Sequence, residues 1–592
     1  MTTATAISAA PAESTVPESP RVPRARWGNA LAVALPVLAL AVLGWRHRAL
    51  TDDGTIFLRT VRQILAGHGP TVNLSERVEA DTSTLWQWLL VVFGAVTPGD
   101  LGFTAVLAGI LLTAAGFAVA LDATRRLHTT AGPRHLLPAG ALVLLAVPVF
   151  WDFAGSGLDS GLGTFWLAGC WWLLVRAHRF PEARSRAAYA VWAGLGFLVR
   201  PDFAIVTAVF LTGLWWVQRP GLRQAAGQLA AALALPVAYE IFRAGYYGLL
   251  VPMPGLTKEP GDSDPVRGLR YAADFAGPLW LYVPLALLGA LAVAHLLRSR
   301  PAPARWVVPL VPVAAAALHA GYVVRIGGDY MHGRMLLPAL FLALLPVLLV
   351  PVRAGTIAVA AATSVWAVAV VGPWHPAAYH ARDTAISIRV RDSDIALTGS
   401  PNADHVAAWT AAFPKLRDAV AEGMAADRPV FVRLAPDMSV GQLLPLGPGH
   451  GSSRVSFPGG FLGVTGALVP LDQYIVETWG LANTVGAHLE YAPGAHRNWP
   501  GHRKPLGDVW LLALELDPSV ADVPGIAAVT PASLAAARHA LGCGDLRELL
   551  ASVREPLTAS RFLRNLTGAY HRTALRIPRD PFAAEAKFCG AR

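Results

Sequence analysis

GNALAVALPVLALAVLGW (residues 28–45) is the first long apolar run of the chain, and Thr51-Asp52-Asp53-Gly54 follows it closely. A run of this length can cross a bilayer as a helix. Two adjacent carboxylates at a membrane boundary are energetically costly, so residues of this kind usually bind a ligand, relay protons or catalyse a reaction. The sequence therefore predicts a membrane protein whose functional centre includes Asp52 and Asp53.

The composition supports a polytopic membrane protein. Of the 592 residues, 54% are hydrophobic and only 15% are charged, whereas a soluble domain has about 25% charged residues. The net charge of +10 comes mainly from Arg residues spread over short loops between apolar runs. This distribution is typical of the loops that orient a membrane protein and not of a nucleic-acid surface. We therefore expect a lipid bilayer as a partner, and no nucleic acid.

The apolar runs predict an α-helical bundle with about eleven transmembrane helices. A shorter apolar piece, residues 84–97, suits an interfacial or re-entrant helix better than a full span. With that assignment, most loop Arg residues fall on the cytoplasmic side, as the charge bias of membrane proteins requires. Besides 28–45, the candidate spans are 101–121, 136–151, 160–178, 187–199, 203–217, 227–247, 276–297, 306–325, 335–351 and 355–372.

The chain is expected to have three parts. Residues 1–27 lack apolar periodicity and indicate a disordered cytoplasmic tail. Residues 28–372 are expected to form the catalytic transmembrane domain, with an external active-site loop at 46–83. Because an odd number of spans follows a cytoplasmic N-terminus, residues 373–592 are expected outside the cytoplasm.

Residues 373–592 combine Gly/Pro-rich turns, short β-like runs (430–434 and 509–516) and Ala-rich helical patterns. This mixture predicts one α/β domain. Outside the cytoplasm, a disulfide between Cys543 and Cys589 is permitted but not required.

The external loop 46–83 carries the first group of candidate site residues. Glycosyl transfer needs a carboxylate to accept the hydroxyl proton of the acceptor, to stabilise an oxocarbenium-like centre, or to attack the anomeric carbon. The alternative is a solvated loop whose first Asp caps a helix that starts near Thr55. The candidate catalytic residues are Asp52 and Asp53, and the other candidates of the loop are His68, Glu79 and Asp81.

This loop resembles the first periplasmic loop of GT-C-type glycosyltransferases, which use lipid-phosphate sugars as donors. In that group an acidic pair follows the first helix, and a Gly-His-Gly turn and an Arg-Val-Glu…Leu-Trp segment come next, as at residues 67–69 and 77–86 here. Among these families the chain looks most like the actinobacterial terminal β-(1→2)-arabinofuranosyltransferases of the AftB type. The family normally has a bulky aromatic residue or Gly where this loop has Ala80-Asp81, which leaves the role of Asp81 open. Further matching segments are VRPD (199–202), RIGGDYMHGR (325–334), GLAN (480–483) and GHRK (501–504).

The segment RIGGDYMHGR also suits a lipid-phosphate leaving group on its own chemistry. Arg can hold phosphate oxygens bidentately, His can donate a proton, and Gly allows close approach of the backbone. The alternative is a tight turn whose Arg side chains reach the lipid head groups. For Arg200 the alternative is an ion pair that closes a helix turn, and for Lys258 it is a mobile external loop. The candidate donor-binding residues are Arg200, Lys258, Arg325, Asp329, His332 and Arg334.

A group of polar and aromatic residues in the tail suits a carbohydrate acceptor. Trp can stack on apolar sugar faces, while Asn, His and Lys can bond to hydroxyl groups; ordinary folding of the domain is the alternative. The spacing of His residues matches no structural zinc pattern, so we expect no metal site here. The candidate acceptor-binding residues are Trp479, Asn483, His502 and Lys504.

The resemblance implies an integral-membrane enzyme at the extracytoplasmic face of the plasma membrane. The expected partners are a polyprenyl-phosphate donor, decaprenyl-phosphoryl-D-arabinofuranose, and an acceptor at the ends of cell-wall arabinan (arabinogalactan or lipoarabinomannan). A β-linked donor and a β-(1→2) product imply net retention, with Asp52 or Asp53 as nucleophile or ion-pair stabiliser. No cofactor is implied, although the sequence leaves a divalent cation open.

Other functions are consistent with the same residues. A GT-C transferase with a mannosyl or aminoarabinosyl lipid donor would use the same loop. A transporter of lipid-linked sugars and a non-catalytic glycan-binding membrane protein are the alternatives from other classes. Transporters tend to carry internal repeats and charges at the bilayer midplane, whereas the acids here are expected at one face, which favours chemistry over transport.

Overall fold

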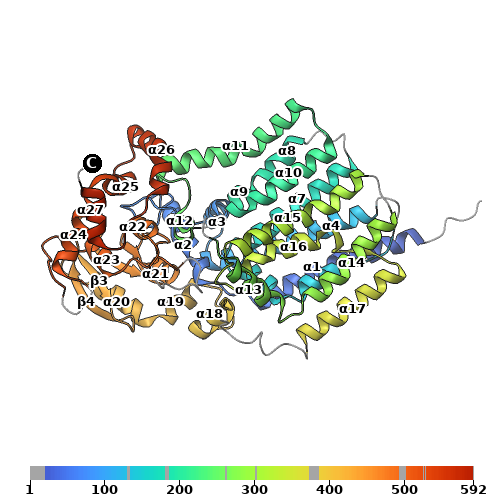
Figure 1. The fold of residues 1–592 in the computed structure, drawn as a ribbon. Helices are drawn as coiled ribbons and strands as arrows, with labels where there is room; N and C mark the ends of the chain where they lie inside the picture. Colours follow the sequence, from blue (N-terminus) through green and yellow to red (C-terminus); the bar gives the residue numbers. More distant parts are fainter. Residues whose placement is uncertain are drawn as a thin grey trace, which may run out of the picture.

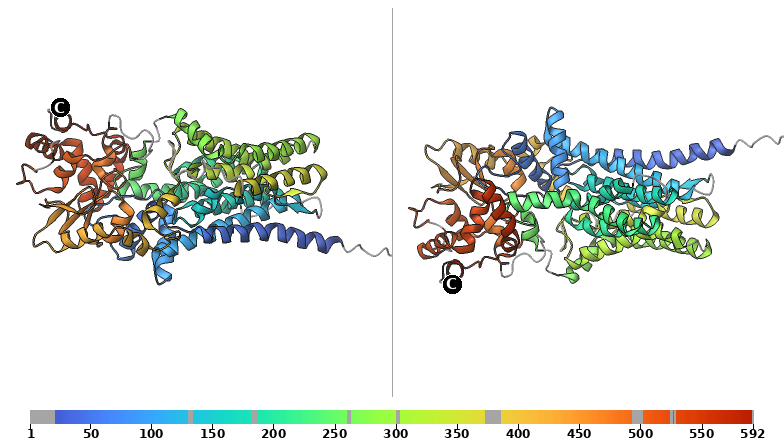
Figure 2. Two further views of the ribbon diagram at one scale, coloured as in Figure 1. Left: turned by 90° about the horizontal axis from the view of Figure 1, so that it is seen from below. Right: turned by 90° about the horizontal axis from the view of Figure 1, so that it is seen from above.

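The computed structural model describes residues 21–129, 134–180, 186–259, 263–299, 303–372, 386–492, 502–523, 526 and 529–590. Figure 1 shows two regions placed end to end: an elongated bundle built from the first part of the chain, and a C-terminal domain that covers one end of it. Helix α1 (Arg21–Arg46) runs along the bundle and starts at the end far from the C-terminal domain (Figure 2). The junction between the two regions therefore lies where α1 ends.

The bundle is helical throughout, as its apolar sequence predicts. Six helices of the described chain are long and apolar enough to cross a membrane: Arg26–Arg46, Leu101–His128, Pro201–Gln218, Leu222–Tyr246, Trp306–Arg325 and Ala354–Val371. Shorter apolar helices are Thr84–Val96, Ala187–Val199, Tyr282–His295 and Arg334–Val347. These helices agree with a polytopic membrane protein, whereas the GT-C type and the number of eleven spans stay predictions.

Three of the expected spans are interrupted instead of continuous. Residues 136–151 contain two short helices, because Pro148 begins a new helix at its first position. The expected span 187–199 divides at Leu195, and 335–351 consists of one short α-helix flanked by 3₁₀ turns. The elements of the bundle after α1 are α3 (Thr84–Val96), α4 (Leu101–His128), β1 (Leu136–Leu137), α5 (Ala139–Leu145), α6 (Pro148–Asp152), η1 (Phe153–Gly155), α7 (Ser160–Arg179), α8 (Arg186–Gly194), α9 (Gly196–Val199), η2 (Pro201–Phe203), α10 (Ala204–Gln218), α11 (Leu222–Tyr246), α14 (Tyr282–Ser299), α15 (Pro303–Arg325), η3 (Arg334–Leu336), α16 (Leu337–Leu344), η4 (Leu345–Val347), β2 (Val350–Pro351) and α17 (Ala354–Val371).

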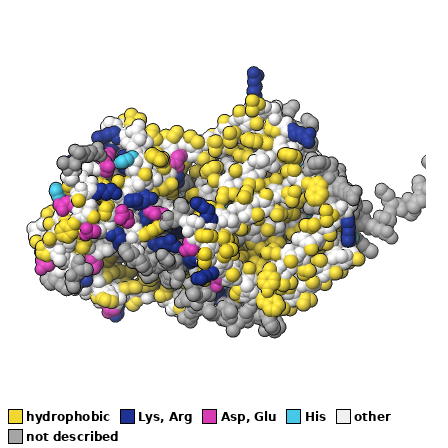
Figure 3. All heavy atoms as spheres, in the orientation of Figure 1, with side chains coloured by type: hydrophobic (Ala, Val, Ile, Leu, Met, Phe, Trp, Pro, Cys, Tyr) yellow, Lys and Arg dark blue, Asp and Glu magenta, His cyan; other side chains and the backbone are white. Residues whose placement is uncertain are grey.

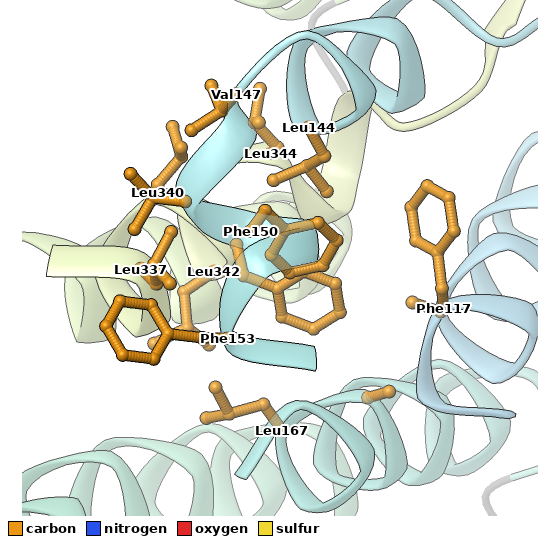
Figure 4. Packing of buried hydrophobic residues seen from close by; sticks show 14 of the residues in the cluster. Phe117, Leu144, Val147, Phe150, Phe153, Leu167, Leu337, Leu340, Leu342 and Leu344 are labelled. Carbon is orange, nitrogen blue, oxygen red and sulfur yellow. The ribbon is translucent and has the colours of Figure 1, made fainter. Parts of the chain in front are cut away.

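The core of the bundle is aromatic and aliphatic. Phe150 stacks on Phe341 with ring centroids 6.1 Å apart, and Phe117 meets Phe150 edge-on at 6.2 Å (Figure 4). Helices α4 and α7 approach closely at glycines, since a Cβ on Gly161 would lie 2.3 Å from the carbonyl oxygen of Gly109. Apolar side chains also cover the outside of the bundle, whereas charged side chains gather over the C-terminal domain (Figure 3).

The C-terminal domain is built on a four-stranded mixed sheet of order β4-β3-β5-β6. Strand β3 (Val430–Leu434) pairs antiparallel with β4 (Val440–Pro445) and parallel with β5 (Val455–Gly459), which pairs parallel with β6 (Tyr474–Glu477). The helices are α18 (Val390–Thr398), α19 (Val406–Ala412), α20 (Pro414–Met424), α21 (Leu462–Leu468), α22 (Thr484–His488), α23 (Asp508–Glu515), α24 (Pro531–Leu541), α25 (Gly544–Arg554), α26 (Ala559–Ala574) and α27 (Pro581–Cys589).

Two expectations for this domain have a clear outcome. The β-like assignment of residues 509–516 was wrong, because they form helix α23; their Leu, Ala and Glu residues favour a helix. Cys543 and Cys589 form a disulfide with Cα atoms 5.2 Å apart.

The loop after the first helix, residues 46–83, packs into the core of the C-terminal domain. This core includes Val72 and Val78 of the loop and Met253 of helix α12 (Met253–Lys258). The loop itself contains helix α2 (Asp52–Leu65), which packs on α21. Helix α13 (Pro265–Ala276) lies at the same junction as α2 and α12 (Figure 1). In Figure 1 these elements lie at the junction of the two regions, so loops from the bundle and helices of the C-terminal domain surround one site.

Candidate active site

The acidic pair begins helix α2. Thr51 is the N-cap, and its hydroxyl accepts a hydrogen bond from the Gly54 amide at 3.0 Å. Asp52 and Asp53 therefore lie in the first helical turn, where the helix dipole favours negative charge. The alternative in which an Asp caps a helix near Thr55 does not hold, because Thr51 is the cap and the helix starts at Asp52.

The two carboxylates face different surroundings. Asp52 Oδ1 accepts a hydrogen bond from the Val464 amide of α21 at 3.0 Å. Burial, and next to it the charge of Asp53, raise the pKa of Asp52 to about 7. The Asp53 side chain is 26% exposed, and its Oδ2 lies 3.8 Å from Nη1 of Arg334. One carboxylate is thus held by the C-terminal domain, while the other faces the turn that contains Arg334.

The turn at 326–334 depends on its glycines. Gly327, Gly328 and Gly333 have φ angles of +87°, +76° and +66°, which Gly adopts far more easily than other residues. A Cβ on Gly328 would lie 2.4 Å from the ring of Tyr271 in α13. Within this turn Arg334 Nε donates to Asp329 Oδ2 at 2.7 Å, so Asp329 holds the guanidinium that faces Asp53.

Helix α13 holds the 326–334 turn through its side chains. Arg267 donates to the carbonyl oxygens of Gly327 and Asp329, and the Tyr271 hydroxyl donates to the Met331 carbonyl at 2.7 Å. Oδ2 of Asp274, on the same helix, lies 3.0 Å from Nδ1 of His332. Because α13 presents these side chains one helical turn apart, it fixes both the backbone of the turn and the ring of His332.

His332 borders one of two cavities at the site. This cavity has an empty volume of about 420 Å³, and besides His332 it is lined by Thr51, Ser156, Asp152 and Arg391, among others. Ser387 Oγ also lies 3.2 Å from His332 Nδ1, so the imidazole is held on that side by both Asp274 and Ser387.

Two guanidinium groups and several apolar side chains line the second cavity. It has an empty volume of about 490 Å³. Arg200 and Arg334 both line this cavity. Nε of Arg200 lies 3.0 Å from Asp202, and its Nη1 lies 3.6 Å from Asp159. The apolar lining residues include Phe150, Phe153, Phe203, Phe341, Leu167 and Leu337, several of which are labelled in Figure 4. Positive charge next to an apolar crevice suits a lipid that carries a phosphate.

The C-terminal domain contributes aromatic side chains next to Tyr330 of the 326–334 turn. His502 meets Trp479 edge-on at 5.3 Å and Tyr330 edge-on at 5.1 Å between ring centroids. The Tyr330 hydroxyl interacts electrostatically with the Asp53 side chain. Two of the four predicted acceptor-binding residues, Trp479 and His502, are thereby connected to the acidic pair.

The other two tail residues make structural contacts. Asn483 caps α22, where its Oδ1 accepts a hydrogen bond from the Gly486 amide at 2.8 Å. Lys504 is fully buried; its Nζ donates to Glu259 at 2.5 Å and to the Ala487 carbonyl at 2.9 Å. These contacts occupy Oδ1 of Asn483 and the ammonium group of Lys504.

Three predicted residues lie away from the acidic pair. His68 is exposed beyond the other end of α2, about 20 Å away along a helix of 14 residues. Arg325 is exposed at the end of α15, where its carbonyl accepts a hydrogen bond from Asp264. Glu79 is buried in an ion pair with Arg243 at 2.6 Å.

Lys258 and Asp81 complete the predicted set. Lys258, at the end of α12, is exposed and interacts electrostatically with Asp53, Asp329 and Arg334. Asp81 is 2% exposed, and neither carboxylate oxygen has a hydrogen-bond partner among the described residues. Burial raises the pKa of Asp81 to about 7. The structure therefore places Lys258 at the site and Asp81 in an enclosed position.

Sequence reasoning missed several residues of the site. Tyr330 was quoted only as part of a motif, and Asp274 and Asp394 were not singled out. For Asp274 a signal existed, because Arg267, Tyr271 and Asp274 recur at the spacing of one helical face. For Asp394 the sequence offered little, since RDSD (391–394) looks like an ordinary solvated helix face.

One cluster of metal-ligating residue types occurs in the described chain. It consists of His539, Cys543 and Cys589, whose ligand atoms lie within 4.8 Å of one another. Both cysteines belong to the disulfide, so they offer no thiolate and this cluster is not a metal site.

Comparison with known proteins identifies the family to which the chain belongs. Residues 459–585 match the family model described as the AftB family C-terminal domain. The chain is 35% identical to the terminal beta-(1->2)-arabinofuranosyltransferase of Mycobacterium tuberculosis, over 92% of this chain and 96% of that protein. It is 40% identical to the protein of the same name from Corynebacterium glutamicum, over 52% of this chain and 49% of that protein. No solved structure gives a significant match. The chain therefore belongs to the family of terminal β-(1→2)-arabinofuranosyltransferases and is a membrane glycosyltransferase.

Proposed function

We propose that this enzyme transfers D-arabinofuranose from a decaprenyl-phosphate donor to the ends of cell-wall arabinan, in arabinogalactan or lipoarabinomannan. The product is a β-(1→2) linkage, formed with net retention. Family membership supports the sugar and the linkage, since the relatives are named for both. The observation that carries the proposal is the 3.8 Å approach of Arg334 to Asp53 beside a cavity with apolar walls.

The donor is proposed to bind with its phosphate at Arg334 and Arg200. Both guanidinium groups line the second cavity, and its Phe and Leu residues would hold the first isoprene units. The proposed donor-binding set also includes Lys258, Asp329 and His332. Asp329 orients Arg334, while His332 borders the first cavity and would have to reach the phosphate from there.

Asp53 is proposed to face the anomeric carbon. In the first step its carboxylate attacks C1, or stabilises an oxocarbenium ion there, while the bond from C1 to the phosphate oxygen breaks and polyprenyl phosphate leaves with the electron pair. In the second step the acceptor hydroxyl oxygen bonds to C1 from the same side as the departed phosphate. On the covalent route the bond between Asp53 and C1 breaks at the same time and its electron pair returns to the carboxylate, which restores the original configuration. Asp52, with its pKa near 7, suits the group that accepts the hydroxyl proton.

The acceptor is proposed to lie between Tyr330, Trp479 and His502. Their rings offer flat apolar surface next to polar atoms, which suits the faces and hydroxyl groups of a furanose. Since Tyr330 also interacts electrostatically with Asp53, an acceptor end held there would lie near the reacting carbon.

The proposed location is the extracytoplasmic face of the plasma membrane. Helices α4 and α7 end in basic residues, Arg125, Arg126, Arg176 and Arg179, at the end of the bundle away from the C-terminal domain. Loops rich in Arg favour the cytoplasm. We propose that residues 28–372 form the catalytic transmembrane domain and that residues 373–592 form an extracytoplasmic glycan-binding domain.

A defined transfer reaction tests this function. Purified enzyme receives synthetic decaprenyl-phosphoryl arabinofuranose and an arabinan oligosaccharide, and the product linkage is determined by NMR. Mannosyl and aminoarabinosyl lipid phosphates are given in parallel to test the alternative donors. Transfer of arabinose in β-(1→2) linkage supports the proposal; transfer from one of the other donors alone, or full turnover by a variant with Asn at both Asp52 and Asp53, contradicts it.

A further inference from the structure

The C-terminal domain supplies a third buried carboxyl group, that of Asp394, which interacts electrostatically with the acidic pair. Helix α18 is fixed beside the 326–334 turn, because Ile388 donates to the Tyr330 carbonyl at 2.7 Å and accepts from the His332 amide at 2.9 Å. Arg391 Nε also donates to the His47 carbonyl at 3.1 Å, near the end of α1. Asp394 on this helix is therefore held at a defined place beside the turn and the end of α1.

Asp394 is buried and has no ion-pair partner among the residues that the structure describes. It is 5% exposed, and its Oδ2 has no hydrogen-bond partner in the described part of the chain. The charges that act on it are those of Asp52 and Asp53, both negative.

The cations on and next to α18 and the imidazole of the adjacent turn have other partners. Arg389 pairs with Asp392 at 3.1 Å, and Arg391 lies 3.9 Å from Asp152. The imidazole of His332 lies against Asp274.

An ionised carboxylate in this position would be very unfavourable. A buried charge needs a partner of opposite sign, whereas here two like charges lie nearby. Burial, and after it these two charges, raise the pKa of Asp394 well above its ordinary value. The neutral carboxylic acid avoids both costs.

We propose that Asp394 is a positioning residue that carries a proton throughout the reaction, so that no third negative charge develops beside Asp52 and Asp53. A third charge would oppose the binding of an anionic donor phosphate at Arg334. This role in catalysis rests on the proposed function, whereas the protonated state of Asp394 can be tested without it.

The first test measures thermal stability as a function of pH. An acid whose pKa is raised by folding destabilises the folded state increasingly as the pH rises from its unfolded value of about 4 to its folded value. Asp394→Asn removes this penalty and keeps the shape of the side chain. We therefore expect the Tm of Asp394→Asn, relative to the unaltered protein, to increase from pH 5 to pH 9. Asp418→Asn, at a carboxylate of α20 that is 71% exposed, is the control and should show no such trend.

The second test measures transfer from the lipid-phosphate donor over the same pH range. Asp394→Asn should change the rate at pH 7 by less than about threefold and should lose less activity at high pH, because its amide cannot ionise. A Tm difference that does not change with pH overturns the proposal. Loss of activity in a folded Asp394→Asn variant, together with loss of wild-type activity in EDTA, also overturns it and indicates a metal ligand. If the unaltered enzyme transfers nothing, the proposed function fails, while the Tm result still decides the state of Asp394.

Discussion

Arg334 Nη1 lies 3.8 Å from Asp53 Oδ2, although the two residues belong to distant parts of the sequence. Asp53 starts the helix after the first span, and Arg334 ends the turn after α15. The contact is possible because α2 packs on the C-terminal domain while α13 holds the turn against the same junction. The carboxylate and the guanidinium thus form one site in which a sugar phosphate can be bound at both ends.

Asp53→Asn is expected to reduce transfer by about a thousandfold or more, because an amide can neither attack C1 nor stabilise a positive charge there. The side chain is partly exposed, so folding should be preserved. The measurement is the initial rate with saturating donor, with Tm as the check on folding. More than a tenth of the normal rate in the pure variant would exclude Asp53 from the mechanism.

Arg334→Lys is expected to weaken donor binding, because Lys cannot hold Asp329 and a phosphate oxygen together through a planar fork. We expect the KM for the lipid-phosphate donor to rise by about tenfold to a hundredfold, with a smaller change in the KM for arabinan. Arg298→Lys, at an exposed position of α14, is the matched control. An unchanged donor KM would show that Arg334 has only a structural role.

The general architecture could be predicted because it depends on local composition. Long apolar runs indicated the helices, and the acidic pair after the first of them indicated the site. The turn at 326–334 was identified by residue chemistry, and the structure brings it to Asp53. Interrupted helices were harder to foresee, since a Pro such as Pro148 can either bend a span or start a new helix.

The roles of single side chains depended on contacts between distant segments. Asn483 and Lys504 have the residue types of a glycan site, but one caps α22 and the other is enclosed by Glu259 and backbone carbonyls. Asp394 looks like a surface residue in the sequence and is buried because α18 is fixed against Tyr330 and His332. No local pattern could distinguish these cases.

Asp52 is expected to give the transfer rate a pH dependence near neutrality. If its carboxylate accepts the hydroxyl proton, kcat/KM should rise as the pH increases through about 7, the pKa of Asp52. The same raised pKa predicts that the folded state loses stability as the pH rises from about 4 to 7, because the folded form retains a proton that the unfolded form releases. Asp52→Asn should remove both effects while its Oδ1 still accepts the Val464 amide. A rate profile with the same acid limb in this variant would assign that limb to another group.

Trp479→Ala is expected to raise the KM for the arabinan acceptor by about tenfold, because it removes a stacking surface beside His502. The donor KM should change little. Asn483→Ala serves as a comparison, since loss of a helix cap costs about 1 kcal/mol of stability and should lower Tm without a selective effect on the acceptor. Equal changes in both KM values for Trp479→Ala would contradict an acceptor-binding role.

The Cys543–Cys589 disulfide is expected to stabilise the C-terminal domain without taking part in transfer. It joins the residue before α25 to the end of α27 across 46 positions of sequence, and closing a loop of that length in the unfolded chain corresponds to about 3–4 kcal/mol. The variant with Ser at both positions should therefore have a Tm several degrees lower, while its initial rate at 25 °C stays within about twofold of normal. Dithiothreitol should lower the Tm of the unaltered protein in the same way and leave the double variant unaffected. A Tm that does not respond to the double substitution or to reduction would mean that α27 is held by its packing on α24 alone.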